Sequence, residues 1–197
     1  MTPDLFLALV SFAFVTSITP GPNNMMLLAS GVNFGFRRSL PHMAGISLGH
    51  MVMVVMTGLG LSSLLLAFPW AGTVLKLAAL AYMLWLAWKI AHADAPGQGA
   101  VGARPMTFVQ AAAFQWVNPK AWAMALGAIA AYAAEGGLAD VALVAAVFAA
   151  VNWPSISVWT YAGTRLRRWL GDPSRLRLFN WGMAALLILS LLPVLRL

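Results

Sequence analysis

The sequence contains no cysteine and only five acidic residues. The absence of cysteine excludes thiol redox chemistry and metal sites built from thiolates. Charged residues make up 9% of the chain, whereas a soluble domain carries about 25%. Hydrophobic residues make up 61%, and this composition predicts an all-α integral membrane protein in contact with the lipid bilayer.

Six apolar stretches run along the chain, and each approaches the roughly 20 residues that a helix needs to cross a bilayer. They are Leu5–Ser30, His42–Phe68, Thr73–Ala91, Thr107–Tyr132, Leu138–Gly163 and Leu178–Leu195. A linker rich in proline and glycine, residues 93–105, separates two sets of three, residues 1–92 and 106–197. An odd number of spans in each half orients the halves oppositely. We therefore expect six transmembrane helices arranged as two inverted three-helix repeats.

Basic residues set the predicted orientation. If all six stretches cross, nine of them share one side, namely Arg37, Arg38, Lys89, Arg104, Arg165, Arg167, Arg168, Arg175 and Arg177. Positive charge marks the cytoplasmic side, which places the linker in the cytoplasm and both termini outside. Asp4 stands where a signal peptide carries positive charge, so we expect the first stretch to remain as a span. The alternative is a chain with five spans and its N-terminus inside.

Prolines interrupt the first stretch at Thr19–Asn24 (TPGPNN) and the fourth at Asn118–Lys120 (NPK). A proline removes a backbone N–H and clashes with the preceding turn, so we expect transmembrane helices 1 and 4 to be broken. The freed backbone groups must face protein or a wet cavity. Two broken spans in corresponding halves predict a transport site between the breaks.

The first break also offers groups that bind an anion. A half-helix that begins near Pro22 presents N–H groups and the positive end of its dipole, and Asn23 and Asn24 add amide donors. The alternative is a proline kink that serves only helix packing.

Lys120 lies near the middle of the fourth stretch, roughly 24 Å from Arg104 and 22 Å from Glu135 along a helix. An unpaired cation at that depth costs several kcal/mol. All five acids fall at or beyond span ends, so the charge near the midplane suits a substrate carboxylate. The alternative is a lysine whose stem lies along apolar surface. His50 is the second titratable candidate inside the membrane, either as a proton relay or as a histidine bonded to a neighbouring helix.

Three further patterns occur in the second and fifth stretches. Residues 152–155 (NWPS) interrupt the fifth stretch, either as a simple kink or as a third wall of the same cavity. Gly45 and Gly49 are spaced for a close contact between helices. A metal site at His42 and His50 is not expected, because neither acids nor thiolates lie near them in the sequence.

The chain resembles the LysE/RhtB family of amino-acid exporters. The resemblance rests on residues 19–23 (TPGPN), 31–38 (GVNFGFRR), 45–49 (GISLG), 75–90 (LKLAALAYMLWLAWKI) and 114–122 (FQWVNPKAW). It implies six helices in two inverted halves and export from cytoplasm to periplasm, driven by the proton gradient. The segments TPGPNN, GISLGH and AYMLWLAWKI look most similar to the cysteine/O-acetylserine exporter branch. Some members carry an acid where this chain has His50, so the resemblance argues against cationic substrates.

We therefore expect a bacterial inner-membrane exporter of small neutral amino acids or derivatives (cysteine/O-acetylserine or homoserine/threonine-like), working by proton-coupled alternating access. The residues expected to bind the substrate are Thr19, Pro20, Gly21, Pro22, Asn23, Asn24, Asn118, Pro119, Lys120 and Asn152. Lys120 and His50 are the expected coupling residues. A transporter of metals or inorganic ions is the alternative, although the sequence lacks ligand clusters for one. No nucleophile with a base is found, so neither enzyme activity nor a cofactor is expected. Nucleic acid is not an expected partner, and a homo-oligomer is left open.

Overall fold

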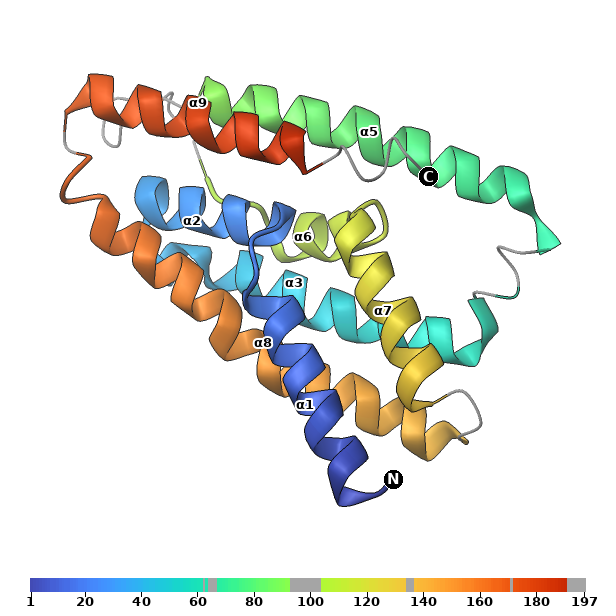
Figure 1. Cartoon of the computed structure of the whole chain (residues 1–197). Coiled ribbons are helices and arrows are strands. Elements are labelled where there is room, and N and C mark those ends of the chain that lie inside the picture. Colours follow the sequence, from blue (N-terminus) through green and yellow to red (C-terminus); the bar gives the residue numbers. More distant parts are fainter. Residues whose placement is uncertain (62, 64–66, 93–103, 134–136, 171, 191–197) are drawn as a thin grey trace.

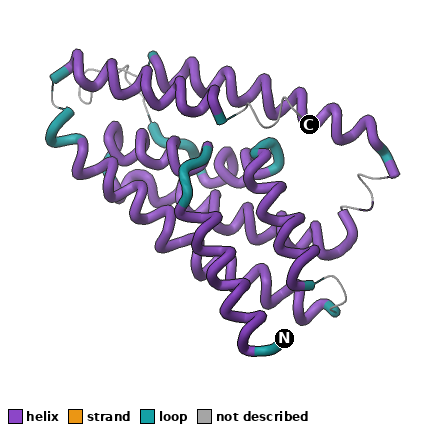
Figure 2. The backbone as a smooth tube through the Cα atoms, viewed as in Figure 1, coloured by secondary structure: helices purple, strands orange, loops and turns teal. Residues whose placement is uncertain are grey.

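A computed structural model describes residues 1–61, 63, 67–92, 104–133, 137–170 and 172–190 of the 197-residue chain. Eight α-helices and one π-helical turn occur among these residues, and none of the described residues forms a strand (Figure 2). The prediction of an all-α chain is confirmed to this extent. Residues 93–103 of the expected linker lie outside the described residues.

The first apolar stretch forms two helices, α1 (Pro3–Ile18) and α2 (Pro22–Phe34), whose axes differ by 54°. Pro22 occupies the first turn of α2, where its missing N–H would have had no helical partner. Gly35 follows α2 with a φ of +81°, a conformation that glycine adopts without steric cost. The chain turns there directly into α3 (Phe36–Met56).

The second stretch begins earlier than hydropathy predicts, because α3 contains Arg37 and Arg38 in its first turn. A π-helical turn, η1 (Thr57–Leu61), follows α3, and Gly60 there has a φ of +105°. The third stretch forms α5 (Pro69–Ala91). Residues 62 and 64–66 of the second stretch lie outside the described residues.

The second half repeats this order of elements. The fourth stretch forms α6 (Phe108–Gln115) and α7 (Pro119–Tyr132), with Pro119 in the first turn of α7. The fifth forms α8 (Leu138–Leu166), and the sixth forms α9 (Pro173–Leu189). Residues 191–195 of the sixth stretch lie outside the described residues.

Pro154 lies inside α8, which runs as one helix from Leu138 to Leu166, so residues 152–155 do not break the fifth stretch. A proline inside a helix removes one backbone hydrogen bond, and neighbouring helices can compensate for that loss in a membrane protein.

Close backbone contacts hold α2, α3, α6 and α8 together. A Cβ added to Gly49 would lie 2.6 Å from the Cα of Ala112 on α6, and one added to Gly45 would collide with the carbonyl oxygen of Phe108. The predicted Gly45–Gly49 contact between helices is therefore confirmed. Gly31 on α2 and Gly163 on α8 allow the backbones of these two helices to approach just as closely. α5 and α9 lie side by side across this group of helices (Figure 1).

Three segments of the described chain are long and apolar enough to cross a membrane, namely Phe36–Leu61, Trp70–Ala91 and Leu138–Leu166. The bent pair α1 and α2 passes the same test as a fourth span. Neither α6 with α7 nor α9 passes it within the described residues, and α9 is 17 residues long where about 20 are needed. Six spans in two inverted repeats therefore stay a prediction.

Candidate functional site

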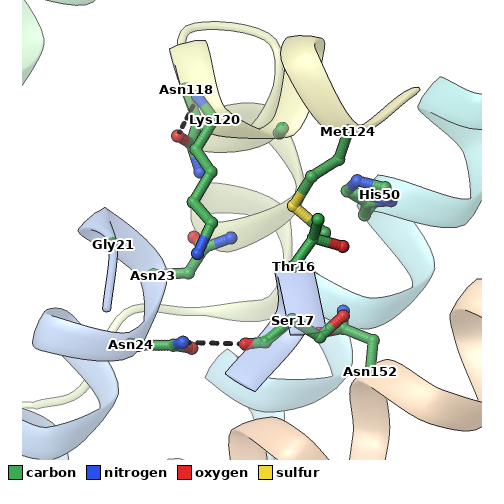
Figure 3. Close-up of a pocket in the computed structure, with 11 residues that line it drawn as sticks. Thr16, Ser17, Gly21, Asn23, Asn24, His50, Asn118, Lys120, Met124 and Asn152 are labelled. Atoms are coloured by element: carbon green, nitrogen blue, oxygen red, sulfur yellow. Dashed lines mark hydrogen bonds between the residues drawn. The ribbon is translucent and has the colours of Figure 1, made fainter. Parts of the chain in front are cut away.

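A polar cavity lies where the two helix breaks meet (Figure 3). Its empty volume is about 320 Å³, part of which opens to the outside. The residues that line it are Thr16, Ser17, Gly21, Asn23, Asn24, His50, Asn118, Lys120, Ala121, Met124 and Asn152. None of these lining residues is acidic, so Lys120 gives the wall a positive charge.

Side chains satisfy the backbone carbonyls that the first break frees. Asn24 Nδ2 donates to the carbonyls of Ser17 and Thr19, at 2.8 Å each. Trp159 Nε1 on α8 donates to the carbonyl of Ile18 at 2.9 Å. These bonds hold the break open at a fixed geometry, and the freed groups face protein as the apolar surroundings require. Both N–H groups of Asn24 are used here, so its amide offers a substrate only its oxygen.

The second break is capped by its own residues. Asn118 precedes α7, and its Oδ1 accepts a hydrogen bond of 3.1 Å from the backbone N–H of Lys120. Trp122 Nε1 donates to the carbonyl of Trp116 at 2.9 Å. Both α2 and α7 thus begin beside the cavity with a proline in the first turn. Each contributes the positive end of a helix dipole there.

Lys120 joins the two breaks. Its Nζ donates to the carbonyl and hydroxyl oxygens of Thr19, at 2.7 and 2.9 Å, and to the carbonyl of Pro20 at 3.4 Å. An ammonium group has three N–H donors, and these contacts use all of them. The bond to Pro20 is the longest and therefore the weakest of the three. Gly21 makes room for the lysine stem, because a Cβ there would lie 2.6 Å from Lys120 Cδ.

A second polar contact joins the halves beside Lys120. Asn23 Nδ2 donates to Gln115 Oε1 at 2.8 Å, and Gln115 Nε2 donates back to Asn23 Oδ1 at 3.1 Å. Gln115 is fully buried and also donates to the carbonyl of Ala111. This pair fixes the start of α2 against the end of α6.

His50, Ser17 and Asn152 lie on the other side of the cavity from Lys120 (Figure 3). The ring of His50 stacks on Phe148, with centroids 5.2 Å apart and planes 24° apart. Neither ring nitrogen of His50 has a hydrogen-bond partner among the described residues, and the same is true of Ser17 Oγ. The expected bond from His50 to a neighbouring helix is therefore absent from the described part of the chain.

Comparison with known proteins identifies the family. A family model described as LysE type translocator matches residues 14–191, which is most of the chain. The chain belongs to this family. The resemblance seen in the sequence motifs is thus confirmed.

Curated relatives match this LysE family member over part of its length. Proteins named cysteine/O-acetylserine efflux protein, from Escherichia coli (strain K12) and Shigella sonnei (strain Ss046), are each 40% identical over 121 residues. The match covers 61% of this chain and 61% of each relative, which is less than two thirds of their length. No solved structure matches the chain.

Seven of the predicted site residues of this LysE family member line the cavity, namely Gly21, Asn23, Asn24, Asn118, Lys120, Asn152 and His50. Thr19 and Pro20 do not line the cavity, but their oxygens accept hydrogen bonds from Lys120. Pro22 and Pro119 are the first residues of α2 and α7. Four further residues line the cavity without having been predicted from the sequence, namely Thr16, Ser17, Ala121 and Met124. Gln115, which bonds to Asn23, was not predicted either. Gln115 had a usable signal, since it is a polar side chain in a largely apolar stretch and lies four positions before Pro119.

Proposed function

We propose that this protein exports small neutral amino acids or their close derivatives across the bacterial inner membrane, by alternating access around the two breaks. The single observation that carries the proposal is the contact of Lys120, on the second break, with the carbonyls of the first break at the wall of a polar cavity. Membership in the LysE type translocator family supports the class of activity. The relatives named as cysteine/O-acetylserine efflux proteins support a small, neutral amino-acid substrate.

The charge distribution of the cavity favours a carboxylate. Lys120 and the positive ends of α2 and α7 surround it, and no lining residue is acidic. An anion binds well at a helix N-terminus because the first N–H groups have no helical partner. A substrate carboxylate would take the place of the long bond between Lys120 and Pro20, while Lys120 keeps its shorter bonds to Thr19. Thr19, Pro20, Asn23, Asn118 and Asn152 complete the proposed site.

We propose Lys120 and His50 as the residues that couple export to protons. They are the titratable side chains among the residues that line the cavity. A transporter of metals or inorganic ions is less well supported, because no group of three or more His, Cys, Asp or Glu side chains in the described chain is placed to hold a metal ion.

We also propose six spans in two inverted repeats with both termini outside. Three pairs of corresponding elements pack against each other, which supports a pseudo-two-fold axis: α3 against α8, α5 against α9, and the first break against the second. Figure 1 shows the junction of α2 with α3 at the same end of the structure as the C-terminus of α8 and the N-terminus of α9, where most of the arginines lie. This arrangement supports a cytoplasmic location for that end.

Efflux from proteoliposomes preloaded with labelled amino acids, with and without a proton gradient, tests the proposal. We expect the substitution Lys120→Met to lower efflux at least about tenfold, because it removes the charge and keeps the apolar stem. Lys76→Met is the matched control, since Lys76 is also half-buried but lies on α5 and does not line the cavity. Lys120→Arg should restore the contacts between the breaks and only part of the efflux, because arginine is larger. Normal efflux by a well-folded Lys120→Met protein would refute the assignment.

A further inference from the structure

The cavity contains buried polar groups that the binding of a carboxylate does not use. His50 and Ser17 are 3% and 4% exposed, and both ring nitrogens of His50 and the hydroxyl of Ser17 have no hydrogen-bond partner among the described residues. Buried polar atoms in folded proteins are nearly always paired, and an unpaired set demands an explanation. Here the three atoms belong to side chains that line one cavity, so a ligand in the cavity can pair with them.

The chemistry of these groups identifies what they pair with. A neutral imidazole has one N–H donor and one acceptor nitrogen, and a serine hydroxyl both donates and accepts. Asn152 adds an amide to the same wall. A ligand group that itself donates and accepts, such as a hydroxyl or a thiol, can satisfy both partners. A methyl group of similar size would fill the space and leave the polar atoms unpaired.

The position of these groups assigns them to one end of the substrate. Figure 3 shows His50, Ser17 and Asn152 across the cavity from the ammonium group of Lys120. If Lys120 holds the carboxylate, the opposite wall faces the side chain. Stacking on Phe148 fixes the plane of the His50 ring, so its nitrogens are presented in a defined direction.

We propose that His50 and Ser17 form the side-chain subsite of the exporter and select amino acids with a short hydroxyl- or thiol-bearing side chain over apolar ones of similar size. This inference rests on the proposed export function. It goes beyond that function by assigning selectivity to two residues that do not contact the carboxylate end of the cavity.

Counterflow in proteoliposomes with L-serine and L-alanine tests the proposal, because the two substrates differ by one hydroxyl. In the unaltered protein we expect L-serine to be preferred by at least about tenfold, as a site built to bond a hydroxyl rejects an analogue without one. His50→Phe keeps a ring to stack on Phe148 and removes both nitrogens, so the preference should fall at least about fivefold. Ser17→Ala removes only a hydroxyl and should lower it severalfold.

His42→Phe is the matched control. His42 lies on the same helix, is 2% exposed and has two unpaired ring nitrogens among the described residues, but it does not line the cavity. Its substitution should leave the serine-to-alanine ratio unchanged.

The outcomes separate this proposal from the proposed function. Export of both amino acids with an equal preference in the unaltered protein would overturn the subsite and leave the export function standing. An unchanged ratio in His50→Phe would overturn it too, and Ser17→Ala decides if His50→Phe does not fold. Absence of all amino-acid transport by the unaltered protein would overturn the export function itself.

Discussion

The contact between α2 and α8 predicts that Gly163→Ala destabilises the protein. A Cβ at Gly163 would collide with the carbonyl oxygen of Leu28 and lie 3.0 Å from its carbonyl carbon and 3.1 Å from the Cα of Gly31. Ordinary contacts lie at 3.4–4 Å. All of these neighbours are backbone atoms, so no side chain can rotate away and the two helices must separate.

The size of the effect follows from two opposing contributions. Overpacking costs about 1–3 kcal/mol, and the higher helix propensity of alanine returns about 1 kcal/mol. We expect the free energy of unfolding to fall by up to about 2 kcal/mol, which lowers the midpoint of thermal unfolding by up to about 8 °C for a chain of this size. Thermal unfolding of the purified protein in detergent, followed by loss of the monodisperse peak in size-exclusion chromatography, measures this shift.

Gly182→Ala provides a control of opposite sign. Gly182 lies within α9, and a Cβ there would meet no atom within 4 Å. Only the gain in helix propensity remains, so this variant should melt about 2–4 °C above the unaltered protein. If Gly163→Ala also melts above the unaltered protein, the backbones of α2 and α8 do not approach closely enough to exclude a Cβ at this position.

Two further predictions concern pH and orientation. Backbone N–H groups of Ser174 and Arg175 hold the pKa of Asp172 below its ordinary value of 3.8. The stability that Asp172 contributes as the N-cap of α9 is therefore fully present above about pH 4 and is lost as the pH falls through the lowered pKa. Asp172→Asn should remove this acid sensitivity of the melting temperature. Because the chain has no cysteine, single cysteines placed at Thr2 and Gly137 should react with an impermeant maleimide from outside, and one at Ser174 only from the cytoplasm. Protection of Thr2→Cys from outside would favour five spans.

Both helix breaks could be predicted from the sequence because proline acts locally. Pro20, Pro22 and Pro119 remove backbone donors whatever surrounds them. The preceding helices end at Ile18 and Gln115, and the next helices begin at Pro22 and Pro119. Pro154 shows the limit of that rule, since α8 continues through it. A single proline costs one hydrogen bond, and whether the helix survives depends on neighbours that the sequence does not display.

Other features could not be predicted because they depend on tertiary packing. Hydropathy marks the apolar part of a helix, so it placed the start of the second helix at His42 although α3 begins at Phe36 with arginines in its first turn. Ser17 and Met124 resemble ordinary membrane-helix residues, and only the packing of α1 against α7 and α8 makes them cavity wall. The amides of Asn23 and Asn24 were expected to bind substrate, but the fold commits most of their donors to protein partners.

The contacts of Lys120 link substrate binding to movement in the proposed exporter. The lysine ties the second break to the first through three oxygens, so any motion that separates the breaks must replace those partners. Water can replace them on a side that is open, whereas in a closed cavity a bare ammonium would be left unpaired at a cost of several kcal/mol. A substrate carboxylate supplies the missing acceptor and carries the compensating charge. Without substrate, we therefore expect the conformation in which Lys120 bonds the two helix breaks together to predominate. With substrate bound, we expect the two breaks to separate more readily. An exporter needs this difference, because its substrate must promote the change of access.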